Sequence, residues 1–299
     1  MRDTHSDLLP VAVIAGATAS GKSSMALTLA EKLNGEIISV DSMQLYKDIP
    51  IGTAQPTAEE KQAVPHHLVG IYDLNIRAEV YTFVEMATAA IRDITSRGRL
   101  PILCGGTGLY LKALLYGLDN LPGDEKLKKE LDIEYDSPEK LAALQARLQS
   151  LGDAAVVEKF SNNRRRLIRA LEIRLLTGRS IIELQGEYTP QLRFDLISGN
   201  AIRLEHDRAV LQNRIALRTK EMLKNGWIDE ARAAIAKGLL TSPTAHQALG
   251  YKIINRYLNN DIDLAGLEQL IVTATWQYAR RQQTWFRHQH PELEVRALS

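Results

Sequence analysis

The sequence contains a single cysteine, Cys104, among its 299 residues. One cysteine excludes an internal disulfide and a zinc site made of cysteines alone. No stretch approaches the roughly 18 apolar residues of a membrane span, and the first seven residues, MRDTHSD, lack the apolar core of a signal peptide. Charge is nearly balanced, with 37 Lys and Arg against 36 Asp and Glu. We therefore expect a cytoplasmic enzyme or binding protein, in which only local basic patches could face nucleic acid.

The first part of the chain alternates short apolar runs with helical patterns. Hydrophobic residues make up 45% of the sequence, which is enough for a core. Residues 11–15, 37–40 and 100–104 predict strands buried on both faces, and 22–33 and 81–97 predict helices. This alternation indicates an α/β fold with a doubly wound parallel sheet. Its ligands should lie beyond the carboxyl ends of the strands.

The character of the chain changes after about residue 121. Residues 124–151 are charged and helical, and 162–176 predict a strongly basic helix that stops at Gly178. Residues 201–204 can return the chain to the sheet. We therefore predict a helical insertion domain over 121–195. The core domain would consist of residues 1–120 and 196–299.

A phosphate-binding loop stands between the first predicted strand and helix. Residues 16–23, GATASGKS, fit the pattern G-x-x-x-x-G-K-[ST]. Glycines let backbone N–H groups turn toward phosphate oxygens, and the helix N-terminus adds partial positive charge. Lys22 supplies a full charge, and the Ser23 hydroxyl can hold Mg²⁺. The loop predicts a phosphate ligand without saying which phosphate ester it is.

An aspartate, Asp41, follows the second predicted strand, at the ligand-bearing edge of the sheet. It could be a Mg²⁺ ligand, a general base, or merely an acid that caps a turn. The third strand is followed by residues 105–110, GGTGLY, with no acid at the position where nucleotidases often carry one. This absence disfavours an ATPase.

Eight short motifs follow one another along the chain: 16–23 (GATASGKS), 41–46 (DSMQLY), 51–56 (IGTAQP), 65–68 (PHHL), 105–110 (GGTGLY), 164–172 (RRRLIRALE), 248–252 (ALGYK) and 280–287 (RRQQTWFR). This ordered set resembles the bacterial-type tRNA dimethylallyltransferases, and the resemblance covers nearly the whole chain. Two substitutions depart from the family pattern, Ala17 for the usual Pro and Ser23 for the usual Thr, and neither removes a backbone donor or the hydroxyl.

The resemblance implies a P-loop NTPase-like fold and a prenyl transfer to tRNA. The dimethylallyl group of dimethylallyl diphosphate would pass to N6 of adenosine 37 in the anticodon loop of tRNAs that read codons beginning with U. The phosphate loop would hold this diphosphate rather than ATP, with Mg²⁺ as cofactor. The family also implies a monomer without an obligate protein partner.

Within this mechanism Asp41 would accept the proton of the adenine amine. Arg214 and Arg218 lie four residues apart on a predicted helix, so they share a face and could hold one diphosphate, unless that face is merely solvated. The predicted catalytic residues are Asp41, Ser23, Thr107 and Arg218. The predicted diphosphate-binding residues are Gly16, Thr18, Ala19, Ser20, Gly21, Lys22, Ser23, Arg214 and Arg218, and Ser23 is the predicted Mg²⁺ ligand.

Adenine 37 must leave its stack to reach an active site, and basic and aromatic residues would compensate for that cost. The basic helix could instead be an ordinary solvated surface, and Trp285 could belong to the core. The predicted tRNA-binding residues are Asp41, Ser42, Met43, Gln44, Thr107, Arg164, Arg165, Arg166, Leu167, Arg169, Gly250, Tyr251, Lys252, Arg280 and Arg281.

Two other functions compete with prenyl transfer. In a small-molecule or nucleoside kinase the loop would bind ATP, and the insertion would be a lid. A nucleotide-driven switch protein should show a base-recognition motif such as N-K-x-D, which the sequence lacks. Salt-sensitive RNA binding would argue against both. His66 and His67 are a weak indication of a metal site, and a structural role fits them better.

Overall fold

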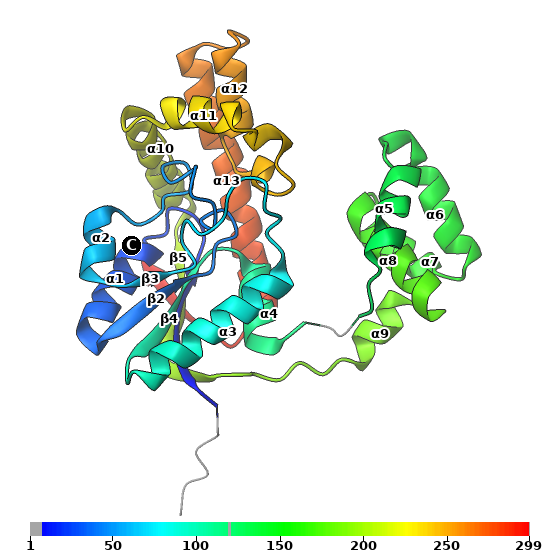
Figure 1. The fold of residues 1–299 in the computed structure, drawn as a ribbon, viewed down its shortest axis with the longest axis horizontal. Coiled ribbons are helices and arrows are strands. Elements are labelled where there is room, and N and C mark those ends of the chain that lie inside the picture. The colour runs from blue at the N-terminus through cyan, green and yellow to red at the C-terminus, as the bar shows by residue number, and fades with distance from the viewer. Residues whose placement is uncertain (1–7, 119–120, 299) are drawn as a thin grey trace, which may run out of the picture. The chain divides into compact units, whose positions relative to one another are not determined.

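The computed structural model describes residues 8–118 and 121–298, and the chain divides into two compact units (Figure 1). The larger unit runs to Gly117 and resumes at Leu192, and the smaller unit spans Leu118–Gln191. The predicted insertion, 121–195, begins three residues later and ends four residues later than this smaller unit.

Six parallel strands form the sheet of the larger unit, in the order β3-β2-β4-β1-β5-β6. The predicted α/β fold with a doubly wound parallel sheet is confirmed. The sequence analysis did not identify β3 and β6, which form the two edges. The strands are β1 (Pro10–Gly16), β2 (Gly35–Ser39), β3 (His66–His67), β4 (Leu100–Gly105), β5 (Asp195–His206) and β6 (Glu294–Leu298).

Alternate residues of β1 belong to two different apolar cores, because side chains of a strand point alternately to the two faces of its sheet. Val11 and Val13 pack with Phe83 in one core. Ala12 and Ile14 belong to the other core. The helices that contribute to these cores include α1 (Lys22–Leu33), α3 (Val80–Ser96) and α4 (Gly108–Tyr116).

The C-terminal helices build a third core around Trp227 and Tyr251, both almost completely buried. None of the helices in the described residues is long and apolar enough to cross a membrane. The remaining helices of the larger unit are α2 (Ala58–Ala63), α10 (Arg208–Lys224), α11 (Trp227–Ala236), η2 (Leu239–Thr241), η3 (Ala245–Gln247), α12 (Tyr251–Leu258) and α13 (Leu264–Gln289).

The smaller unit is entirely helical within the described residues and has its own core, in which Leu144, Leu167 and Leu171 are fully buried. The basic helix ends at Gly178, whose φ of 71° is left-handed, as the sequence predicts. The helices of this unit are α5 (Glu125–Glu134), η1 (Pro138–Lys140), α6 (Leu141–Ser150), α7 (Ala154–Phe160), α8 (Arg164–Thr177) and α9 (Ile181–Glu187).

Candidate active site

The phosphate loop joins β1 to α1, which begins at Lys22, so the predicted strand, loop and helix are confirmed. Ala19 and Gly21 have φ values of 62° and 87°, and the left-handed backbone turns successive N–H groups toward one side of the loop. The first N–H groups of α1 add donors at the same place. The loop therefore has the geometry of an anion-binding site.

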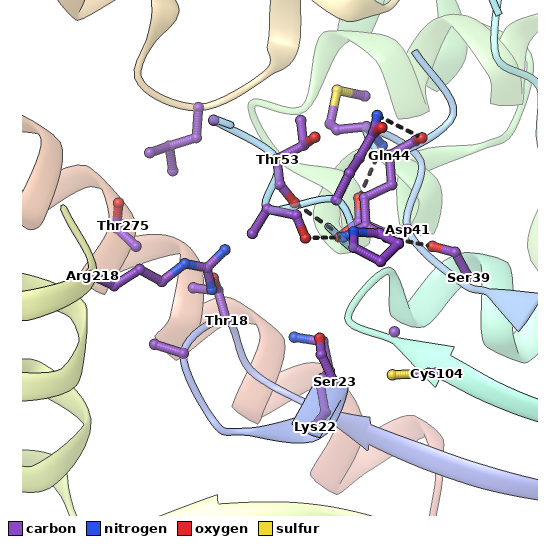
Figure 2. Close-up of a pocket in the computed structure, with 18 of the residues that line it drawn as sticks. Thr18, Lys22, Ser23, Ser39, Asp41, Gln44, Thr53, Cys104, Arg218 and Thr275 are labelled. Atoms are coloured by element: carbon purple, nitrogen blue, oxygen red, sulfur yellow. Dashed lines mark hydrogen bonds between the residues drawn. The ribbon is translucent and has the colours of Figure 1, made fainter. Parts of the chain in front are cut away.

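A cavity of about 600 Å³ opens beside this loop (Figure 2). Its walls come from the phosphate loop, the segments after β2 and β4, and helices α10 and α13. Figure 2 shows Lys22 and Ser23 on one side, Asp41 and Gln44 on another, and Arg218 with Thr18 facing them. The predicted residues that line it are Thr18, Ala19, Lys22, Ser23, Asp41, Ser42, Met43, Gln44, Arg218 and Arg281.

Lys22 lies within the cavity and its Nζ donates to the carbonyl of Ala17 at 3.2 Å. Burial lowers the pKa of Lys22, whereas the nearby Asp41 carboxylate raises it. Cys104 lies close by, and burial raises the pKa of its thiol to about 11, so the thiol is neutral at pH 7. The cavity thus holds a desolvated cation that gains strongly from an anionic ligand.

Two arginines of α10 contact the phosphate loop, so they share a face of this helix, as their spacing predicts. Arg214 Nε donates to the carbonyl of Ala19 at 2.7 Å, and Arg218 Nη1 donates to Thr18 Oγ1 at 3.1 Å. Burial lowers the pKa of Arg218, and the charge of Asp41 opposes that shift. Because a guanidinium does not lose its proton in proteins, Arg218 remains a cation inside the cavity.

Asp41 lies just beyond β2, and its Oδ1 accepts the N–H of Met43 at 2.9 Å. Thr107, at the start of α4, fixes both neighbours of this aspartate. Its N–H donates to the carbonyl of Val40 at 3.1 Å, and its Oγ1 accepts the N–H of Ser42 at 3.1 Å. The turn interpretation of Asp41 is therefore correct as geometry, and it holds the carboxylate at the cavity wall.

Gln44 is held at both ends of its amide. Its Oε1 accepts the hydroxyl of Ser39 at 2.7 Å, and its Nε2 donates to the carbonyls of Thr53 and Ala54 at 3.1 and 2.8 Å (Figure 2). The Gln44 side chain thereby ties the segment after β2 to the loop that begins at Ile51. A ligand in the cavity would meet a rigid wall here.

A sequence model described as IPP transferase matches residues 44–289, and one described as isopentenyl transferase matches residues 9–73. The chain belongs to the IPP transferase family. It is 41% identical over 285 residues to the tRNA dimethylallyltransferase of Methylococcus capsulatus, covering 94% of this chain and 90% of that one.

Solved structures of the IPP transferase family share the fold. The full-length tRNA isopentenylpyrophosphate transferase of Bacillus halodurans has a TM-score of 0.69 at 37% identity, covering 97% of this chain and 90% of that chain. A eukaryotic dimethylallyltransferase, described as acting on tRNA, has a TM-score of 0.79 at 30% identity, covering 97% and 74%. These likenesses establish a P-loop NTPase-like core for this IPP transferase.

The basic helix α8 of this IPP transferase divides the predicted tRNA-binding residues into two groups. Arg165 and Arg166 are exposed, as a binding surface requires. The prediction that Leu167 contacts tRNA needs correction, because this residue is fully buried in the core of the smaller unit and has no exposed surface. Arg169 pairs with the buried Glu172 at 2.7 Å, so its first role is structural. Arg164 donates to the backbone of this unit.

Tyr251 and Gly250 also need correction. The Tyr251 side chain is 1% exposed and its hydroxyl donates to Glu230, so it cannot contact tRNA directly. A Cβ on Gly250 would lie 2.4 Å from the Trp227 ring, which explains the glycine by close packing. Lys252 is exposed and stays a candidate.

The basic residues near the end of α13 border a second, more open cavity of about 650 Å³, whose wall includes Arg280, Arg281 and Trp285. Trp285 is partly buried against Gly108, and its Nε1 is buried without a partner within the described chain. Arg287 pairs with Glu205 at 3.1 Å. This surface supports Arg280 and Arg281 as candidates.

Three residues of the site were not predicted from the sequence. Glu230 accepts the N–H groups of Ile51 and Gly52. Tyr278 and Gln282 line the cavity from α13, and burial together with the charge of Asp41 raises the pKa of Tyr278. Tyr278 lies three positions before Arg281 and four before Gln282, a spacing that puts Tyr278 on the same helix face as each of them. The two histidines of β3 make structural contacts: Nδ1 of His66 bonds to the carbonyl of Val64, and Nε2 of His67 bonds to the carboxylate of Glu36.

Proposed function

We propose that the protein is a tRNA dimethylallyltransferase that moves the dimethylallyl group of dimethylallyl diphosphate to N6 of an adenosine in tRNA. Membership of the IPP transferase family supports this reaction. The observation that carries it is that Asp41 lines the same cavity as Lys22 and Arg218. A base and a diphosphate site in one cavity suit a displacement in which an amine loses a proton as diphosphate departs.

The reaction forms a bond from adenine N6 to the allylic carbon and breaks the bond from that carbon to a diphosphate oxygen. Asp41 accepts the proton that N6 releases. Its carboxylate is held in place for this by the N–H of Met43 and by the bond between Thr107 and the neighbouring Ser42. Lys22, Arg218 and the backbone donors of the phosphate loop stabilise the negative charge that develops on diphosphate.

A magnesium ion fits the donor set of this cavity. Mg²⁺ usually retains water and binds through one or two protein oxygens together with substrate phosphates. The Ser23 hydroxyl lines the cavity beside Lys22 and is the proposed protein contact of the ion. When bound, the ion would neutralise the charge of the diphosphate oxygens.

The finer substrate assignment is also proposed. We infer that the target is adenosine 37 of the anticodon stem-loop, in tRNAs that read codons beginning with U, and that the enzyme acts as a monomer in the cytoplasm. The motifs quoted above support these points through their likeness to the family. Exposed Arg165, Arg166, Lys252, Arg280 and Arg281 are the proposed tRNA contacts.

Mass spectrometry of tRNA nucleosides tests the reaction. The protein is incubated with unmodified tRNA, Mg²⁺ and dimethylallyl diphosphate, and the digested nucleosides are examined. An isopentenyl mass on adenosine is expected, together with a stoichiometric yield of diphosphate. A parallel melting experiment should show greater stabilisation by dimethylallyl diphosphate than by ATP. Stabilisation by ATP alone, without modified adenosine, would identify a kinase instead.

A further inference from the structure

Gln282 joins the two loops that build the active site. It lies on α13, its side chain is 6% exposed, and both ends of its amide are bonded to backbone. Oε1 accepts the N–H of Thr18 in the phosphate loop at 2.8 Å. Nε2 donates to the carbonyl of Gly106, after β4, at 2.9 Å. These partners are 264 and 176 positions away from Gln282 in the sequence.

The amide sits where the sheet stops pairing these two segments. Strands β1 and β4 are neighbours, and Ala15 and Gly105 form the last pair in their register. Beyond that pair the two segments separate: the one after β1 forms the phosphate loop, and the one after β4 leads into α4. A primary amide carries one acceptor and a donor, as a peptide group does. The Gln282 side chain therefore continues the hydrogen-bonding between β1 and β4 beyond the end of the ladder.

Gly106 is shaped to receive this side chain. A Cβ on Gly106 would lie 2.4 Å from Gln282 Nε2 and 3.2 Å from the carbonyl oxygen of Gly16. The next residue, Thr107, bonds to both neighbours of Asp41. One continuous set of bonds thus runs from the phosphate loop through Gln282 and Gly106 to the segment that holds the carboxylate.

We propose that Gln282 is a positioning residue that sets the phosphate loop and the Asp41 segment at a fixed separation. At that separation the diphosphate places its allylic carbon beside the amine whose proton Asp41 accepts. The proposal rests on the proposed function and adds to it a residue whose amide is bonded at both ends to backbone of the active-site loops. A misplacement of about 1 Å between reacting groups can cost about 100-fold in rate. The separation therefore matters more for turnover than for affinity.

Three variants test this role. Gln282→Met keeps the length and apolar volume but removes donor and acceptor. Gln282→Glu keeps the acceptor for Thr18 and, when ionised, places a second acceptor against the carbonyl of Gly106. Gln269→Met, at an exposed position of the same helix, is the matched control. Prenylated tRNA, kcat, KM for each substrate, and the melting temperature are measured for all of them.

We expect kcat to fall about 10- to 100-fold in Gln282→Met, with tRNA affinity within threefold of wild type and the control unchanged. The rate of Gln282→Glu relative to wild type should rise as pH falls from 9 to 6. Burial raises the pKa of a carboxyl, and a neutral acid can again accept from Thr18 and donate to Gly106. Dividing by the wild-type rate at each pH removes the pH dependence that the two enzymes share.

The outcomes separate this proposal from the proposed function. A wild-type enzyme that makes no prenylated adenosine overturns the function itself. An active wild type with Gln282→Met retaining kcat within twofold overturns the positioning role, as does a lower melting temperature without loss of kcat in the folded protein. If Gln282→Met does not fold, a flat pH ratio for Gln282→Glu refutes it.

Discussion

The carboxylate of Glu230 on α11 accepts the hydroxyl of Tyr251 on α12, with Oε1 and Oη 2.6 Å apart. The same carboxylate accepts the N–H groups of Ile51 and Gly52 at 2.6 and 2.9 Å. A side chain on Gly52 would collide with the Trp227 ring and the Tyr251 hydroxyl. Glu230 therefore fixes the loop whose later carbonyls orient the amide of Gln44.

Replacing Glu230 by Gln should lower both stability and turnover. The amide keeps one acceptor and brings a donor against backbone N–H groups, so at least one buried hydrogen bond is lost. Hydrogen bonds to charged groups contribute about 1.5–3 kcal/mol, and we expect the free energy of unfolding to fall by about that amount. Urea denaturation measures it. The exposed neighbour Asp229, changed to Asn, should shift stability by less than about 0.5 kcal/mol.

Asp41→Asn should reduce kcat by about 10²- to 10⁴-fold, because the amide cannot take the proton of the attacking amine. The amide oxygen can still accept the N–H of Met43, so the fold and both substrate affinities should be kept. Single-turnover assays with saturating tRNA measure the rate. Asp73→Asn, at an exposed ion pair with Lys47, serves as the control. Near-normal turnover in Asp41→Asn would remove this residue as the base.

Arg218→Gln should weaken the binding of dimethylallyl diphosphate by about 10- to 150-fold, the equivalent of 1.5–3 kcal/mol for a charged hydrogen bond. Arg214→Gln should weaken it less, because Arg218 is the more buried cation and lies nearer Asp41. Isothermal titration of the diphosphate measures both. Lys220→Gln on the exposed side of α10 should leave the affinity unchanged. Equal losses in all three variants would indicate only a general effect of charge.

Local patterns were enough to predict strands β1, β2 and β4 and the helix that begins at Lys22. They failed where packing decides. Met25, Leu29 and Leu33 form an apolar stripe that predicts the buried face of α1, yet Leu33 is 45% exposed. The fully buried residues of α1 are Ala26 and Ala30, whose small side chains let the helix approach the sheet closely, whereas Met25 and Leu29 pack against the same core and stay partly exposed.

In the candidate site, too, local sequence patterns predict some residues and long-range contacts decide the others. A phosphate loop and an acid after a strand are contiguous signals, so Lys22 and Asp41 could be found from the sequence. The bonds that Gln282 and Glu230 make to the loops of the site could not, because those backbone partners lie more than 170 positions away in the sequence. No spacing rule links an α13 amide to the loop after β1. Strand β6 was also missed, since its exposed residues have no buried apolar run.

The pH dependence of stability should reveal the ion cluster around Glu36, whose side chain is 2% exposed. Hydrogen bonds from Arg97, with smaller contributions from Arg99 and His67, hold the pKa of the Glu36 carboxyl well below its usual range, although burial opposes them. A lowered pKa in the folded state stabilises the protein above the unfolded value of about 4.3. That contribution is lost as the pH falls below this value toward the folded pKa.

Glu36→Gln should therefore lower the free energy of unfolding by about 1–3 kcal/mol at pH 7. This range allows for solvent screening, because the side chains of Arg97 and Arg99 are 41% and 33% exposed. The difference from wild type should narrow between pH 4.5 and 3. Urea denaturation across this range measures it, with the exposed Glu85→Gln as a control that stays near wild type throughout. A difference that is constant with pH would assign the loss to packing rather than to charge.

Arg165→Ala on α8 should weaken tRNA binding and reduce its salt dependence, because an exposed arginine that contacts one phosphate contributes about one unit to the slope of log K against log salt. Arg169→Ala should instead destabilise the smaller unit, since it leaves the carboxylate of Glu172 buried without its cation. Arg92→Ala on the exposed side of α3 should change neither quantity. Fluorescence titrations of tRNA between 50 and 200 mM salt, paired with melting curves, distinguish the roles. A salt slope equal to wild type in Arg165→Ala would show that this part of α8 does not meet the tRNA backbone.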